Sequence, residues 1–280
     1  MSYQTASDRV EALRNIRGGR LTKWKGVVVS CAPTMGAVAL AISTLGFAGA
    51  ANAANECGVA GATVICDAAD AGHPNYPTGI TYTNVASAMT LTLNDAAIVV
   101  GNPGVSVSGS AANTGAITVN GTSFGTITTT GTSAPGISAQ TAGLGDTLAQ
   151  MEGGTVTTGG ASAIGLSSNI TNASSTATAT ALLTDGDVVT AGDIGHGGLA
   201  RTSGLGATLA QMDGGTVTTG GKFAYGLYSN INNAASTAMA TALLNAGDIV
   251  TTGDSGRGVY ASTSGLGATL AQMDGGTVTT

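Results

Sequence analysis

Gly143–Thr158 reads GLGDTLAQMEGGTVTT, and nearly the same sequence begins again at Gly204 and at Gly265. Only Asp146 and Glu152 change, to Ala and Asp in both later copies. The three copies begin at positions 143, 204 and 265, so they are evenly spaced along the chain. Repetition at a fixed period of this kind is typical of architectures in which each unit packs against its neighbours along the chain.

A shorter repeat divides each of these long periods in two. A glycine followed by a strand of Thr, Val and Ile recurs at intervals of two slightly different lengths, which alternate. These glycines are Gly125, Gly154, Gly186, Gly215, Gly247 and Gly276. Between them, Ala and Thr alternate strictly from Ala177 to Ala181, which predicts a strand with Ala on one face and Thr on the other. Each unit of about 30 residues therefore predicts three short strands joined by turns.

Stacking of these units predicts an all-β fold, a parallel β-helix or β-solenoid with rungs of about 30 residues. One unit cannot bury its own apolar face, whereas stacked units do so and contribute roughly 1.5–3 kcal/mol for each buried aliphatic side chain. A helical fold is disfavoured, because Gly and Thr each cost about 0.5–1 kcal/mol in a helix interior. One predicted inward ladder consists of Val156, Val188, Val217 and Ile249, and a second consists of Leu166, Leu199, Leu227 and Val259.

Charge is divided unevenly along the chain. Residues 1–25 hold six basic and two acidic residues, a net charge of +4, and the rest holds three basic and thirteen acidic residues, a net charge of −10. An acidic body repels phosphate groups, which argues against nucleic acid as a partner. The hydrophobic fraction of 42% and the small net charge per residue argue against disorder.

The N-terminal segment has the pattern of a leader. No charged residue occurs between Lys25 and Glu56, and this apolar stretch ends in the small residues Ala51-Asn52-Ala53. A basic region, an apolar region and an Ala-x-Ala signal in this order predict a secretory signal peptide over residues 1–53, cleaved after Ala53. An uncleaved membrane anchor is the alternative, since about 20 apolar residues can span a bilayer.

Two cysteines follow the leader. Cys57 and Cys66 are nine residues apart, and in an exported protein this spacing predicts a small-loop disulfide at the N-terminal end of the solenoid. A metal site with Asp67 and His73 is the alternative, although the gap exceeds the usual Cys-x2-Cys spacing. We therefore expect no metal. The absence of a phosphate-binding loop and of a dinucleotide fingerprint predicts no cofactor.

The aromatic residues of the second half lie beside Gly-Leu or Gly-Val dipeptides. Facing outward, they would form a contact patch for a carbohydrate or a protein, and facing inward, they would fill corners of the solenoid. This candidate contact patch consists of Phe223, Tyr225, Tyr228 and Tyr260.

Two patterns raise the possibility of catalysis. Residues 253–256, Gly-Asp-Ser-Gly, match the nucleophile motif of chymotrypsin-like proteases, but they occupy a position that repeats as a turn. Asp193, His196 and Arg201 come nearest to the acid and base cluster of a polysaccharide-cleaving β-helix, and Asp254 and Arg257 follow one period later. Catalysis needs one asymmetric constellation, whereas an acid copied at every turn is typical of a corner cap. We therefore expect no catalytic residue and no enzyme, with a polysaccharide lyase or hydrolase as the alternative.

A family resemblance extends over residues 54–280. Gly79–Tyr82 (GITY) and Leu91–Leu93 (LTL) precede rungs such as Gly125–Thr129 (GTITT) followed by Ala134–Ile137 (APGI). With the leader and the early cysteine pair, this texture resembles the passengers of autotransporters. The resemblance implies a right-handed parallel β-helix, passage through the inner membrane by the export machinery, and a C-terminal outer-membrane barrel that would lie beyond Thr280.

These observations predict three segments: a signal peptide at 1–53, an N-terminal capping part at 54–110 and solenoid repeats at 111–280 that stop inside a rung. The stop inside a rung predicts a fragment of a longer product. The predicted function is that of an exported passenger, a stalk or adhesin on the cell surface or outer membrane or a secreted protein, reached through the periplasm. The free solenoid of a two-partner secretion system is a further alternative.

Overall fold

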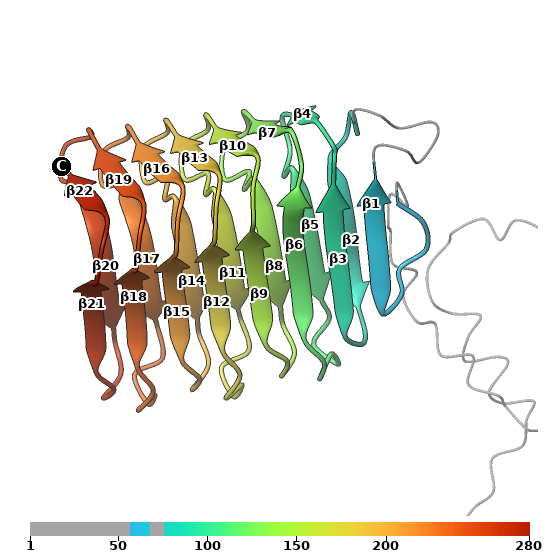
Figure 1. The fold of residues 1–280 in the computed structure, drawn as a ribbon. Coiled ribbons are helices and arrows are strands. Elements are labelled where there is room, and N and C mark those ends of the chain that lie inside the picture. The colour runs from blue at the N-terminus through green and yellow to red at the C-terminus, as the bar shows by residue number, and fades with distance from the viewer. Residues whose placement is uncertain (1–56, 68–75) are drawn as a thin grey trace, which may run out of the picture. The chain divides into compact units, whose positions relative to one another are not determined.

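The computed structural model describes residues 57–67 and 76–280, which form a parallel β-solenoid of about seven turns. The predicted leader, its cleavage position after Ala53, and His73 lie outside the described residues. Figure 1 shows the strands stacked rung upon rung, from β1 at one end to β21 and β22 at the other. The predicted all-β parallel solenoid is confirmed, and its rungs are about 29 residues apart, close to the predicted length of about 30.

Three parallel sheets form the walls of the solenoid, and each turn contributes one strand to each sheet. Sheet A contains β1 (Thr63–Asp67), β3 (Met89–Asn94), β6 (Ile117–Ser123), β9 (Thr147–Met151), β12 (Ala179–Leu183), β15 (Thr208–Met212), β18 (Ala240–Leu244) and β21 (Thr269–Met273). Sheet B contains β2 (Ile80–Val85), β5 (Val105–Gly109), β8 (Ile137–Thr141), β11 (Leu166–Ile170), β14 (Gly198–Thr202), β17 (Tyr225–Ile231) and β20 (Arg257–Thr263). Sheet C contains β4 (Ile98–Val100), β7 (Thr126–Thr129), β10 (Thr155–Thr158), β13 (Asp187–Thr190), β16 (Thr216–Thr219), β19 (Asp248–Thr251) and β22 (Thr277–Thr279).

Sheet C carries the first predicted ladder. Val188 pairs with Val156 on one side and with Val217 on the other, and Val217 pairs with Ile249. All four side chains are buried. Because strand residues alternate between faces, the intervening Thr and Val residues point outward. This ladder of the predicted core is confirmed.

The second predicted ladder is wrong at one residue. Strand pairing places Gly198, and not Leu199, between Leu166 and Leu227. Leu166 and Gly198 are as far apart in sequence as the paired residues Thr155 and Asp187 of sheet C. The prediction aligned the Gly-Leu dipeptides instead, and that alignment is longer by one residue. A shift of one residue moves a side chain to the opposite face of a strand, so Leu199 lies on the outside of sheet B.

Glycine has two distinct roles at the corners. Gly186 has a φ of 97°, in the left-handed region that residues with a Cβ rarely adopt. Gly165 is needed for space instead, because a Cβ there would lie 2.2 Å from Cγ1 of Val188 and 2.6 Å from the carbonyl oxygen of Gly197. Both roles recur in later turns at the same position of the repeat, which explains why glycine keeps its phase along the chain.

The interior explains why the sequence repeats every second turn. In one turn, the hydroxyl groups of Thr147 in β9 and Ser168 in β11 meet across the interior at 2.7 Å. Two turns later Thr208 and Ser229 form the same pair, also at 2.7 Å. The turn between them has buried alanines at the corresponding positions, Ala179 in β12 and Ala200 in β14. Hydroxyl-paired and alanine layers thus alternate, which doubles the period.

Candidate functional site

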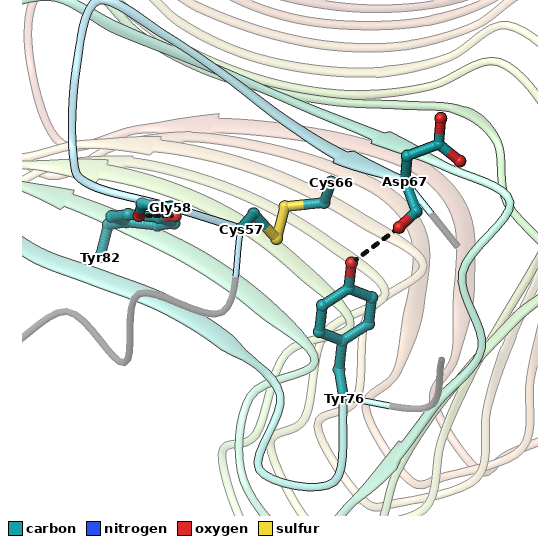
Figure 2. Close-up of a disulfide and its surroundings, with 6 residues drawn as sticks. All are labelled: Cys57, Gly58, Cys66, Asp67, Tyr76 and Tyr82. Carbon is teal, nitrogen blue, oxygen red and sulfur yellow. Dashed lines mark hydrogen bonds between the residues drawn. A yellow bond between two sulfur atoms is a disulfide. The ribbon is translucent and has the colours of Figure 1, made fainter. Parts of the chain in front are cut away.

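The predicted cysteine pair lies at the N-terminal end of the described solenoid. The sulfur atoms of Cys57 and Cys66 are bonded at 2.06 Å, and Cys66 is buried in β1 (Figure 2). The loop between the cysteines is held to the next turn, because the Tyr82 hydroxyl donates to the carbonyl oxygen of Gly58 at 2.9 Å. Within residues 57–67 and 76–280, no group of three His, Cys, Asp or Glu side chains is arranged to hold a metal ion.

The candidate contact patch belongs to the outer face of sheet B, which we call the B face. Parallel pairing aligns its outward residues in three ladders. The first consists of Pro103, Pro135, Ile164, His196, Tyr225 and Arg257. The second consists of Ser106, Ser138, Ser167, Leu199, Tyr228 and Tyr260, and the third of Ser108, Gln140, Asn169, Arg201, Asn230 and Ser262. Side-chain size therefore rises along the first two ladders towards the C-terminal turns, whereas the third ladder is largest at Arg201.

A groove of about 550 Å³ occupies the part of the B face where the side chains are small. Serines such as Ser138 and Ser167 lie on its floor, with Pro135 beside them. Towards the C-terminal turns, the groove ends at the larger side chains of His196 and Leu199. The groove thus results from short side chains on a regular sheet, and its walls carry hydroxyl, amide and guanidinium groups.

An aromatic cluster continues the B face beyond the groove. The ring of Tyr225 lies 5.0 Å from that of Tyr228 and 5.1 Å from that of Tyr260, and Tyr228 and Tyr260 are stacked at 5.4 Å. His196 stacks on Tyr225 at 4.9 Å, and the guanidinium of Arg257 lies 4.2 Å from the ring centre of Tyr260. Such contacts are favourable for aromatic and cationic groups, so the cluster is held together by its own members.

Phe223 was predicted as part of the same patch, but it lies at the corner before β17. Its side chain is 54% exposed and its φ is 55°, within a turn, and it has no ring contact with the described tyrosines. His196 and Arg257, which the prediction left out of the patch, belong to it. The repeat could have identified both residues. His196 and Tyr225, and likewise Tyr225 and Arg257, are separated by the same intervals as successive corner glycines, so they occupy equivalent positions in successive turns.

A polar network fixes the orientation of Tyr228. The side-chain amide of Asn230 donates to the Tyr228 hydroxyl at 2.8 Å and to the Ser262 hydroxyl at 2.6 Å. The two hydroxyl groups are 3.2 Å apart. Because Asn230 is almost fully buried beneath this network, the Tyr228 ring is set in place before any ligand arrives.

His196 is buried between the groove and the aromatic cluster. Its Nδ1 accepts the backbone N–H of Tyr225 at 3.1 Å. Loss of hydration on burial lowers the pKa of His196 to about 4, so the imidazole is neutral at pH 7. Asp193 lies at the corner before β14. Its carboxylate accepts the backbone N–H of Lys222, in the next turn, at 2.9 Å.

The protease-like motif at 253–256 forms a corner of the solenoid. The backbone N–H of Gly256 donates to the carbonyl oxygen of Gly253 at 3.1 Å, which closes a tight turn. Ser255 has a φ of 60° and is exposed at the tip. Ser133, Ser162, Ile194 and Phe223 occupy the same corner position in earlier turns, with φ between 55° and 58°. The geometry is therefore that of a repeated turn.

Comparison with protein-family models, with curated proteins and with solved structures gave no significant match. Among residues 57–67 and 76–280, no helix has the length and apolar character needed to cross a membrane. The fold and the B face define the chain as a parallel β-solenoid with a groove, lined by both serines and apolar residues, that ends at an aromatic cluster.

Proposed function

We propose that this chain is an exported, non-enzymatic protein of the cell surface, in which the solenoid serves as a stalk or adhesin. The observation that carries the proposal is the B face, where groove and aromatic cluster form one continuous surface across consecutive turns. A stack of paired strands holds such a surface rigid, because each turn is hydrogen-bonded to the turns on both sides. This arrangement suits contact with an extended ligand.

Export is supported by the leader pattern of residues 1–53 together with the cysteine pair that follows it. Disulfides persist in oxidising compartments outside the cytoplasm, and the bond between Cys57 and Cys66 lies only four residues beyond the predicted cleavage position. The resemblance to autotransporter passengers adds an outer-membrane translocator as a partner, either on the same polypeptide or as a separate protein.

Expression of the full chain in a bacterium tests this proposal. We expect mass spectrometry to find a mature N-terminus at Ala54 and no free thiol at Cys57 or Cys66. When an outer-membrane translocator is co-expressed, we expect protease added to intact cells to digest the chain. Ala51→Lys should leave the leader attached, because the third residue before the cleavage position must be small. Asn52→Lys is the matched control and should be cleaved. An uncleaved chain with reduced cysteines inside the cell would overturn the proposal.

A polysaccharide lyase or hydrolase is the second candidate function. It is favoured by one observation, that His196 and Arg201 line the same groove. The low pKa of His196 and the hydrogen bond at its Nδ1 argue for a structural role. Incubation of the chain with polygalacturonate distinguishes the two functions, since a lyase creates an absorbing double bond and a hydrolase creates reducing ends. We expect neither product. Formation of either product by the wild-type chain, with loss of that product in His196→Phe, would favour the enzyme.

A further inference from the structure

The few positive charges of the solenoid gather on one side of it. Residues 57–280 hold twelve acidic residues and three basic ones, Arg201, Lys222 and Arg257. Arg201 and Arg257 are outward residues of the B face, and Lys222 is at the corner that leads into it. None of the outward positions of β5, β8, β11, β14, β17 and β20 carries an acid. In a strongly acidic body, the B face is therefore the surface that attracts anions.

Both arginines of the B face have free capacity for a negatively charged group. Within the described residues, the one ion pair is that of Lys222 with Asp254, at 3.9 Å. Arg201 is exposed at the groove and donates through Nε to the side-chain oxygen of Asn169 at 3.4 Å, which leaves its terminal nitrogens available. A guanidinium binds carboxylate-like groups through two parallel hydrogen bonds, so Arg201 is suited to hold one beside the groove.

The backbone of sheet B excludes one common mode of peptide binding. Each strand from β5 to β17 is paired on both sides, so no extended peptide can add to it through main-chain hydrogen bonds. A ligand on this face therefore meets side chains, and those that line the groove include five serines beside apolar residues such as Pro135 and Ile164. Hydroxyl groups both donate and accept hydrogen bonds, which matches a ligand whose own surface is rich in hydroxyl groups.

The ladders also favour a linear polymer. Equivalent side chains on adjacent strands repeat at about 4.8 Å, so the serine ladder offers the same group at regular steps along the solenoid axis. Beyond it, Tyr228 and Tyr260 are stacked with their planes 22° apart and present amphipathic rings at the end of the groove. Neutral His196 stands between the two parts and adds no competing charge at pH 7.

We infer that the B face binds an acidic linear glycan that runs along the solenoid axis. Serines of the groove floor bind its hydroxyl groups, Arg201 and Arg257 bind the negative groups on its sugars, and the tyrosine cluster supports sugar rings. This inference names the ligand class of the proposed adhesin and rests on that proposed function. Negative groups on sugars can be carboxylates or sulfates, and the choice of probes separates these two sources.

Calorimetry on the full chain with its disulfide formed tests the inference. The probes are an oligogalacturonate, a heparin-derived oligosaccharide and a neutral dextran fragment of similar length, with poly-glutamate as an acidic peptide. We expect at least one acidic glycan to bind about tenfold or more tightly than dextran and poly-glutamate, and rising salt to weaken it. Oligogalacturonate alone would identify carboxylates, and heparin alone sulfates. Equal binding of dextran or of poly-glutamate, or no binding of either acidic glycan, would overturn the inference.

Matched variants locate the site. Arg201→Gln should weaken the acidic glycan about tenfold, whereas Lys222→Gln, which removes a cation already paired with Asp254, should change binding less than twofold. Ser167→Leu should abolish binding by filling the groove floor with the residue found next in its ladder, Leu199. Thr180→Leu is the control on the outer face of sheet A, where its neighbours are already leucines. Equal losses in Ser167→Leu and Thr180→Leu would contradict the assignment.

The result is separable from the localisation test. A chain that reaches the cell surface but binds neither acidic glycan would overturn this inference alone. A chain that binds one with the expected variant effects but is not exported would overturn the proposed function and leave the binding site in place.

Discussion

The N-terminal turns and the repeat turns build the same solenoid from different side chains. Between β1 and β5 the core holds large residues such as Tyr76, Tyr82 and Leu91, and the disulfide lies beside them. From β9 onward Ala, Val, Ser and Thr fill much of the interior, beside larger residues such as Met151 and Leu166. Register shifts occur in the pairs β2–β5 and β3–β6, whereas pairing from β7 to β22 has none. Large buried side chains and a disulfide thus stabilise the irregular N-terminal turns, whereas ladders of repeated residues stabilise the regular turns.

The largest effect should come from emptying the N-terminal core. Tyr82 is fully buried, and Tyr82→Ala should cost about 3–5 kcal/mol of unfolding free energy, because it leaves a cavity in β2. Urea unfolding checks the size of the loss, and hydrogen exchange should show it in β1 to β5 first. Tyr82→Phe, which removes the hydrogen bond to Gly58, should cost only about 1 kcal/mol. Uniform loss of protection along the solenoid would mean that the two regions unfold as one.

Acid should weaken the repeat turns through His196. Its pKa is about 4 in the folded chain against 6.5 in the unfolded one, so it contributes no pH dependence well above pH 6.5, where both states are neutral. As the pH falls from 6.5 to 4, only the unfolded state gains the proton, and stability declines by up to about 3 kcal/mol. The difference between wild type and His196→Phe, measured by urea unfolding across this range, isolates the effect. A constant difference would show that His196 does not titrate this way.

Reduction of the disulfide should weaken the N-terminal turns alone. For a loop closed by residues 57 and 66, chain entropy predicts a loss of about 2–3 kcal/mol. The double variant Cys57→Ser with Cys66→Ser should show this loss in hydrogen exchange of β1 and β3. Protection of β15 to β18 serves as the internal control and should not change. A loss of similar size in those distant strands would contradict a difference between the regions.

The smallest effect concerns the hydroxyl layers of the repeat turns. Ser229→Ala leaves the Thr208 hydroxyl without its partner in the core and should cost about 1–2 kcal/mol. Adding Thr208→Ala recreates the alanine layer of the neighbouring turn, Ala179 with Ala200, and should recover part of this loss. A double-mutant cycle in urea measures the coupling. Strict additivity of the two changes would show that the hydroxyl pair has no energetic role.

The sequence allowed most of the fold to be predicted, and the errors have a physical cause. The ladder from Val156 to Ile249 follows directly from the repeat, because identical strands stack at matching positions of successive turns. Leu199 was assigned to the wrong face because a dipeptide match differs from the true offset by one residue, and one residue reverses a strand. In the N-terminal turns, which lack a period, no ladder could be predicted at all.

The class of fold, the length of a turn and the phase of the corner glycines follow from the sequence alone, since each depends only on a period along the chain. Which residues meet on the B face depends on how successive turns stack in three dimensions. His196 and Arg257 contact the tyrosines, whereas Phe223 does not. Contact between turns requires that the strands pair in the exact register, so an error of one or two residues in the alignment changes the members of the cluster. The groove likewise depends on the relative size of side chains from different turns, which are brought together only by stacking.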